Sequence, residues 1–247
     1  MTEPTHISSP ENPLYRSVKK LVGSAKERRK TQRAVLDGWH LLEAYAQAHG
    51  VPERVLLATD AKKIAVLDDK LFDQLAPVEE PSGVLCLIAI PAPLKRPEQF
   101  CLLLEDIQDP GNLGSMLRTA AAAGADAVYL SKGCTDAWSP KALRGGMGAQ
   151  FQLALHEQAD LVTAARNFRG KVIATSLAAS DSLYALDLTG PSAFVFGNEG
   201  AGLSDEMLAC ATHRIRIPMP GQVESLNAAA AAAICLFERV RQVAKVV

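Results

Sequence analysis

The sequence predicts an α/β protein in which a small α/β domain precedes a larger domain built on a parallel sheet. In the second half, short and nearly continuous apolar segments alternate with helical stretches, as in parallel sheets covered on both faces. The segment PAPLKRPEQ, over 91–99, holds three prolines between two apolar runs and is typical of a linker. We therefore expect a first domain over 1–93, a linker over 94–99 and a second domain over 100–247.

The elements of the first domain follow from periodicity and from breaker residues. A helix is expected over about 38–49, where Gly50 ends it, and a strand over 54–58. A short helix near Leu71–Leu75 and a strand over 84–90 complete the pattern.

The second domain contains six expected strands and two prominent helices. The strands are expected at 101–105, 127–131, 151–155, 171–175, 193–197 and 214–218. One helix is expected over about 113–123, and an alanine-rich helix runs to about Val243. Ligands of parallel sheets bind at the carboxyl ends of strands, so the loops after Glu105, Phe196 and Ile217 are the candidate site.

Composition excludes several classes of protein. Hydrophobic residues make up 48% and charged residues 21%, which is ordinary for a globular chain, and the net charge of −1 confines any nucleic-acid contact to a local surface. The five cysteines form no CxxC pair and no metal-ligand spacing, so we expect no metal and a reducing, cytoplasmic setting. No apolar run is long enough for a membrane span, and no membrane partner is expected.

A basic stretch lies near the N-terminus. Between Arg16 and Arg33 there are eight Lys and Arg residues against the single acid Glu27, which leaves a local charge of +7. Such a concentration attracts phosphates and releases their counterions, so Arg28, Arg29, Lys30 and Arg33 are candidate RNA contacts. A solvated helical face is the alternative.

The first candidate loop runs from Asp109 to Arg118, after a strand and into a helix. Gly111 and Gly114 allow close backbone approach, and the amides at the start of the helix could bind an anion. Arg118 follows Asn112 by six residues, about 9 Å along a helix axis, so both could face one cleft. A plain strand–turn–helix with a surface arginine is the alternative, and the GxGxxG fingerprint is missing.

Two further loops contain polar side chains beside glycines. The segment GNEGAGL, over 197–203, follows an apolar strand and suggests a tight loop that presents Glu199 beside a ligand; a simple glycine-rich turn is the alternative. The segment IPMPGQVESLN, over 217–227, places Ser225 and Asn227 at the start of the alanine-rich helix, where a carboxylate is favoured. Taken alone, a serine at this position is more often simply a helix cap.

Together, the three ordered motifs resemble the SpoU (TrmH) class of the SPOUT-superfamily RNA 2′-O-ribose methyltransferases. The motifs are N-x-G-x-x-x-R (112–118), G-N-E-G-x-G-L (197–203) and I-P-M-x-G-x-x-x-S-L-N (217–227), and the resemblance covers about 100–247. It implies a deep trefoil knot in the second domain, S-adenosylmethionine as cofactor and a homodimer packed through the knotted domain. The segment RAVLDGWH, over 33–40, supports a looser resemblance of the first domain to the ribosomal-protein-like RNA-recognition domain of many family members.

The resemblance also implies roles for individual residues. Cofactor binding is implied for Thr175, Ser176, Leu177, Gly197, Ile217, Met219 and Leu226. Catalytic roles are implied for Asn112, Arg118, Glu199, Ser225 and Asn227. The family assigns removal of the hydroxyl proton to the arginine that matches Arg118, but a guanidinium normally stays protonated, so we expect Arg118 to orient the 2′-hydroxyl or a phosphate instead.

One position departs from the family, and several alternatives stay open. Relatives often have a small hydroxyl residue near Gly146, so a side-chain contact there is missing or replaced by backbone. We expect rRNA as the substrate rather than tRNA, because a separate recognition domain suits a folded site. The alternatives are a tRNA 2′-O-methyltransferase, a knotted enzyme that methylates a base nitrogen, a non-catalytic RNA-binding protein with this fold, and a generic nucleotide-binding enzyme.

Overall fold

The chain forms two compact units in the computed structural model, which describes residues 6–57, 65–67, 69–75, 83–95 and 97–244. The first unit comprises Met1–Pro91 together with Asp136–Phe151, and the second comprises Ala92–Thr135 and Gln152–Val247. This division differs from the continuous one expected from the linker, because the segment 136–151 returns to the first unit. Arg96, inside the expected linker, lies outside the described residues.

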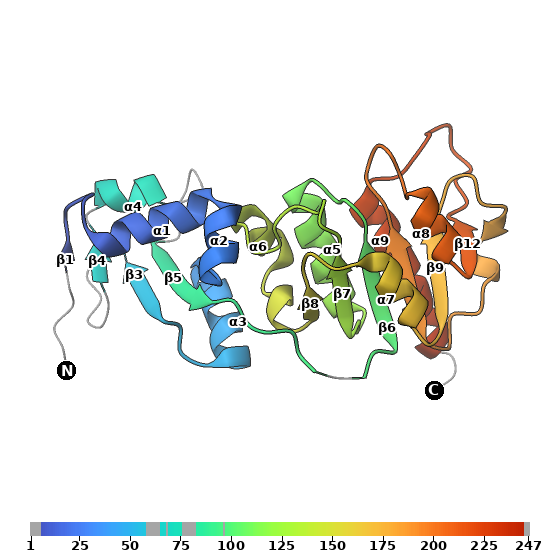
Figure 1. The fold of residues 1–247 in the computed structure, drawn as a ribbon, viewed down its shortest axis with the longest axis horizontal. Coiled ribbons are helices and arrows are strands. Elements are labelled where there is room, and N and C mark those ends of the chain that lie inside the picture. The colour runs from blue at the N-terminus through green and yellow to red at the C-terminus, as the bar shows by residue number, and fades with distance from the viewer. Residues whose placement is uncertain (1–5, 58–64, 68, 76–82, 96, 245–247) are drawn as a thin grey trace. The chain divides into compact units, whose positions relative to one another are not determined.

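The first unit is built on a mixed five-stranded sheet in the order β1-β4-β3-β5-β2 (Figure 1). Its strands are β1 (His6–Ile7), β2 (Arg33–Asp37), β3 (Arg54–Leu57), β4 (Ala65–Leu67) and β5 (Val84–Ala89). Its helices are α1 (Pro13–Gly23), α2 (Ala25–Thr31), α3 (Trp39–His49), α4 (Asp69–Leu75), α6 (Pro140–Gly146) and the 3₁₀ turn η1 (Ala149–Phe151).

The apolar contacts of the first unit involve both its sheet and the segment over 136–151. Val35 of β2 joins the apolar cluster formed with α1 and α4. The ring of Tyr45, on α3, meets the ring of Phe151 edge-on at 5.4 Å, so α3 and the end of the returning segment share apolar contacts. The returning segment therefore contributes to the core of the first unit.

A buried ion pair fixes the returning segment to α2. The Arg28 Nε atom donates to Asp136 Oδ2 at 2.6 Å, and both side chains are 5% exposed. The same guanidinium donates to the carbonyls of Leu21 and Val22, while Asp136 Oδ1 accepts from the backbone N–H of Trp138. These hydrogen bonds offset the desolvation cost of burying the two charges.

Gly146, the departure from the family pattern, is explained by Gln150. A Cβ at position 146 would lie 2.7 Å from the Gln150 Nε2 atom and even closer to its oxygen. Gln150 is buried, and its Nε2 atom donates to the carbonyls of Ala137 and Ala142. The amide therefore occupies the space that a side chain at position 146 would need.

The second unit is built on seven parallel strands in the order β10-β12-β9-β11-β6-β7-β8. The strands are β6 (Phe100–Leu104), β7 (Ala127–Leu130), β8 (Ala154–His156), β9 (Lys171–Thr175), β10 (Asp181–Ser182), β11 (Ser192–Phe196) and β12 (His213–Arg216). The helices are α5 (Pro110–Ala122), α7 (Leu161–Asn167), α8 (Asp205–Cys210), α9 (Ala228–Ala244) and the 3₁₀ turn η2 (Leu183–Ala185). The α/β class and parallel sheet expected from the sequence are confirmed.

Helices cover both faces of this sheet (Figure 1). Cys101, Leu103 and Val195 point to the cluster formed with α7 and α8. Phe100 and Phe194, at alternating positions, meet edge-on beneath α9, whose Arg239 lies 4.1 Å above the Phe100 ring. Across the described residues, no helix combines the length and apolarity needed to cross a membrane.

One expected strand was wrong at its start. The apolar run over 151–155 predicted a single strand, but Phe151 ends η1 and only Ala154–His156 is extended. The ring of Phe151 packs on Tyr45 and Trp138 in the first unit, whereas β8 pairs with β7 in the second. The apolar run therefore serves two cores.

We predict that Asp136→Ala lowers the free energy of unfolding by about 3–5 kcal/mol, because it leaves the Arg28 guanidinium buried without its carboxylate. Urea unfolding followed by circular dichroism measures the change. Lys30→Ala is the control, since Lys30 is exposed on α2 and its loss should cost no more than about 0.5 kcal/mol. Equal unfolding midpoints for the two variants would contradict the stabilising role of the pair.

Candidate functional site

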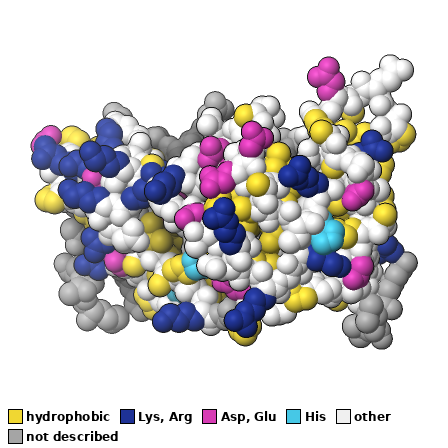
Figure 2. Space-filling model, turned by 45° about the vertical axis from the view of Figure 1, so that its right-hand side comes forward, with side chains coloured by type: hydrophobic (Ala, Val, Ile, Leu, Met, Phe, Trp, Pro, Cys, Tyr) yellow, Lys and Arg dark blue, Asp and Glu magenta, His cyan; other side chains and the backbone are white. Residues whose placement is uncertain are grey.

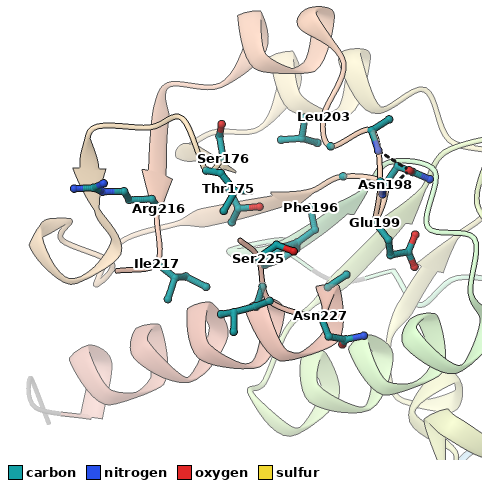
Figure 3. A pocket seen from close by; sticks show the side chains of 18 of the residues that line it. Thr175, Ser176, Phe196, Asn198, Glu199, Leu203, Arg216, Ile217, Ser225 and Asn227 are labelled. Atoms are coloured by element: carbon teal, nitrogen blue, oxygen red, sulfur yellow. Dashed lines mark hydrogen bonds between the residues drawn. The ribbon is translucent and has the colours of Figure 1, made fainter. Parts of the chain in front are cut away.

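The second unit holds a pocket of about 650 Å³ at the carboxyl ends of its parallel strands. The ends of β9, β11 and β12, which are neighbours in the sheet, and the start of α9 surround it. Figure 3 shows the labelled side chains arranged around one hollow above the first turns of α9. Its volume lies in the range of pockets that bury a small organic ligand.

Eleven of the twelve residues expected to bind cofactor or act in catalysis line this one pocket. They are Asn112, Thr175, Ser176, Leu177, Gly197, Glu199, Ile217, Met219, Ser225, Leu226 and Asn227. Arg118 is the exception, because it lies on an exposed face of α5 and does not line the pocket of its own chain. The three motifs therefore converge in space, with the arginine outside the pocket.

The Asn112 side chain joins all three motifs. Its Nδ2 atom donates to Glu199 Oε1 at 3.0 Å, and its Oδ1 atom accepts from Asn227 Nδ2 at 2.9 Å. Asn227 in turn accepts, through Oδ1, from the backbone N–H groups of Ala229 and Ala230. A continuous chain of hydrogen bonds thus runs from the 197–203 loop through α5 to the first turn of α9.

Glu199 is held as a carboxylate. Burial by itself raises the pKa of this carboxyl, but hydrogen bonds from the Asn112 side chain and from backbone N–H groups, including that of Gln108, outweigh burial and leave the pKa below its ordinary value. At neutral pH the group is therefore ionised. A carboxylate with a lowered pKa is a poor proton acceptor, so Glu199 suits positioning and charge stabilisation better than general base catalysis.

The loop over 197–203 closes on itself. Asn198 and Gly202 form an isolated bridge, and Asn198 Oδ1 accepts from the N–H groups of Gly200 and Ala201 (Figure 3). At Gly197 the two sides of the loop are so close that a Cβ would lie 2.6 Å from the Leu203 nitrogen, and nearer still to the Gly202 carbonyl. Only glycine fits there.

The helix starts differ from the sequence expectation. The Asn112 N–H, expected to be open to an anion, donates to the Asp109 carboxylate that caps α5. At α9 the cap is Asn227 rather than Ser225, and its Oδ1 atom accepts hydrogen bonds from the N–H groups of Ala229 and Ala230. These amides are therefore not available to an anionic group.

Two residues that directly follow β6, and that the sequence motifs do not include, anchor the 197–203 loop. The Glu105 carboxylate accepts from the Ser204 N–H at 2.8 Å and from its hydroxyl at 2.7 Å. The backbone carbonyl of Asp106 accepts from Asn198 Nδ2 at 2.9 Å. Both acids follow β6, and nothing in the local sequence marks partners about 90 residues away along the chain.

The pocket residues fit a ligand with an apolar part and a polar part. Leu177 and Leu226 remain 63% and 36% exposed beside the pocket, so each retains apolar surface that a ligand could cover. The Thr175 hydroxyl is already bonded to the Val195 carbonyl, but the side chains of Ser176, Arg216 and Ser225 and the backbone of the loops also line the pocket and can serve as polar partners. This lining fits S-adenosylmethionine, which combines an adenosine with a charged amino-acid chain.

The predicted RNA contacts lie in the first unit, and one of them is wrong. Arg28 is buried in its ion pair with Asp136, so it cannot contact a phosphate. Arg29 and Lys30 are exposed on α2, and Arg33 is exposed beside Glu53 at 2.9 Å. Figure 2 shows Lys and Arg side chains gathered over α1 and α2, so this helical surface remains strongly basic without Arg28.

We predict that Gly197→Ala abolishes cofactor binding, because its methyl group would collide with backbone across the loop. Gly200→Ala is the matched control, since a Cβ there meets nothing closer than the Asn198 side chain at 3.6 Å. Titration calorimetry with S-adenosylmethionine measures both variants. If Gly197→Ala bound as tightly as Gly200→Ala, the loop would not form the wall of the cofactor pocket.

Comparison with known proteins agrees with this geometry. The profile of the SpoU rRNA Methylase family matches residues 99–237. An uncharacterised tRNA/rRNA methyltransferase of Synechocystis is 35% identical over 96% of this chain and 93% of its own length. The 23S rRNA (guanosine(2553)-2′-O)-methyltransferase of Bacillus subtilis is 31% identical over 94% of this chain and 97% of its own.

Solved structures match both units. The AdoMet-bound rRNA methyltransferase of Sinorhizobium meliloti superposes with a TM-score of 0.85 at 27% identity, covering 97% of this chain and 98% of that protein. The family profile spans more than half of the chain and the two sequence relatives span nearly all of it. The chain therefore belongs to the SpoU rRNA Methylase family.

Proposed function

We propose that this protein transfers a methyl group from S-adenosylmethionine to a ribose 2′-hydroxyl of RNA, with rRNA as the substrate. The observation that carries the proposal is the convergence of the three motifs in one pocket, joined through Asn112, Glu199 and Asn227. The relatives named as 23S rRNA 2′-O-methyltransferases favour ribose over a base nitrogen, and rRNA over tRNA. An intact pocket argues against a non-catalytic RNA-binding protein.

The residues of this chain bind the cofactor and orient the ribose hydroxyl. S-adenosylmethionine, when bound, supplies a methyl group on a sulfonium, which is already activated for transfer. Backbone of the 197–203 and 217–227 loops would hold it, with Leu177, Met219 and Leu226 covering its apolar surface. Alignment of the hydroxyl with the methyl carbon is then the main requirement, and positioning of this kind can supply several kcal/mol.

Arg118 can act on the reacting ribose only when a second molecule is bound. Because it does not line its own pocket, bound RNA or a second subunit must bring the reacting ribose and Arg118 together. A homodimer suits this face: α5 contacts α9, and their outer surfaces expose small residues together with Phe237, which is 48% exposed. We propose that the dimer packs through α5 and α9. The trefoil knot stays a prediction.

RNA would be held by the basic surface of α1 and α2, where Arg16, Lys19, Lys20, Lys26, Arg29 and Lys30 are exposed. The setting we propose is the cytoplasm. All five cysteines are free, and four of them are buried, which fits a reducing compartment.

We predict that Arg118→Ala abolishes methyl transfer while leaving cofactor affinity within about twofold, because Arg118 lies outside the pocket. The assay uses methyl-labelled S-adenosylmethionine with rRNA and with tRNA. Nuclease digestion and mass analysis then separate methylated ribose from methylated base.

The control for this variant is Arg166→Ala, an exposed arginine on α7. Full activity of Arg118→Ala would remove Arg118 from the mechanism. Methyl groups found only on bases, or on no RNA, would overturn the proposed reaction.

We predict that the double variant Arg29→Ala/Lys30→Ala weakens RNA binding. The slope of log affinity against log salt concentration should fall by the amount that corresponds to about two phosphate contacts. Filter binding over a range of salt concentrations measures the slope. The matched control is Arg166→Ala/Arg169→Ala, which removes the same charge from the second unit. An unaltered slope would place the RNA-binding surface elsewhere.

A further inference from the structure

An exposed tryptophan lies at the start of α3 in the first unit. Trp39 is 53% exposed, whereas Trp138, the other tryptophan of the chain, is 3% exposed in the core of the same unit. Exposing half of so large an aromatic side chain forfeits the burial that normally stabilises a fold. Neither the proposed reaction nor the basic surface of α1 and α2 uses Trp39.

The surroundings of Trp39 come from two distant parts of the chain. Arg144 of α6 donates to Asp37 at 2.8 Å, just before α3 begins. Farther along α3, a Cβ at Gly148 would lie 2.7 Å from the Ala44 methyl group. The end of β2 therefore lies against α6, and α3 lies against the chain that follows α6, all within the first unit.

The exposed residues at this junction form what we call the Trp39 face. They are Trp39, His40, Lys141, Arg144 and Met147. Met147 is 38% exposed, so the face combines a flat aromatic ring and a flexible apolar side chain with cationic groups.

In the ion pair of Arg144 with Asp37, the arginine is the partner that faces solvent. The Asp37 side chain is 8% exposed beneath Arg144, whose side chain is 50% exposed. The buried acid thus fixes the guanidinium in place, while the arginine, and not the acid, faces outward. Glu43 on the next turn of α3 is the exposed acid nearby along the helix, against the two exposed cations Lys141 and Arg144.

We propose that the Trp39 face binds an unpaired RNA nucleotide, with its base stacked on the Trp39 ring and its phosphates beside Arg144 and Lys141. Aromatic rings flanked by cations bind single-stranded RNA because every base has a flat face that can stack. The inference rests on the proposed function only in taking RNA as the substrate. It adds a contact to a base, which the cationic surface of α1 and α2 does not provide.

The test uses the full-length protein with a short single-stranded oligoadenylate. Binding should quench tryptophan fluorescence, and Trp39→Phe should abolish the quenching, because Trp138 is buried. Trp39→Ala should weaken binding by about tenfold, while Trp39→Phe, which keeps a flat ring, should stay within about threefold of the unmodified chain. The matched control is Tyr184→Ala, since Tyr184 is 54% exposed in the second unit.

Salt dependence separates stacking from charge attraction. Trp39→Ala should retain the slope of affinity against salt concentration, because stacking releases no counterions. The Arg29→Ala/Lys30→Ala variant should flatten that slope. Circular dichroism of Trp39→Ala and Trp39→Phe should match the unmodified chain, since an exposed ring contributes little to folding.

Three results would overturn the assignment of Trp39. They are unchanged affinity in Trp39→Ala, equal losses in Trp39→Ala and Trp39→Phe, or quenching that persists in Trp39→Phe. If the unmodified chain still methylates RNA in any of these cases, the proposed function stands and only the base contact fails. If the unmodified chain binds and methylates no RNA, the proposed function fails, and the base contact with it.

Discussion

The amide of Asn112 joins three segments that are far apart in the sequence. One side of it bonds to Glu199 and the other to Asn227, so the α5 helix, the 197–203 loop and the start of α9 are fixed relative to one another. An amide suits this position because it donates and accepts at the same time. The shape of the pocket depends on this network, because it connects all three motifs that line the pocket.

The parallel sheet determines where those segments meet. β12, β9, β11 and β6 are neighbours in space but not in sequence, and their carboxyl ends all lie at one edge. Each ends in a loop that contributes to the pocket or anchors it, as Glu105 does through Ser204. A ligand at this edge therefore touches residues more than one hundred positions apart while the strands beneath it stay in regular register.

The first unit separates structural charge from binding charge. Arg28 lies among seven other cations in the sequence, yet its guanidinium is buried against Asp136 and holds the returning segment in place. The same segment contributes Arg144, which a buried acid keeps turned outward. Charges that look alike in the sequence thus divide into those that stabilise the unit and those that remain open to solvent.

Apolar periodicity, which is a local signal, predicted the α/β class, six of the seven strands of the parallel sheet and two of the five strands of the first sheet. The roles of the eleven pocket residues came from the resemblance of the three motifs to the family. The sequence also identified the helix that contains Arg118. The folded structure was needed to show that Arg118 lies outside its own pocket, that Arg28 is buried, and that Glu105 anchors a loop. It likewise divided the apolar run at 151–155 between two cores. Each of these depends on partners far away along the chain, and no local pattern encodes which distant residue arrives beside a given side chain.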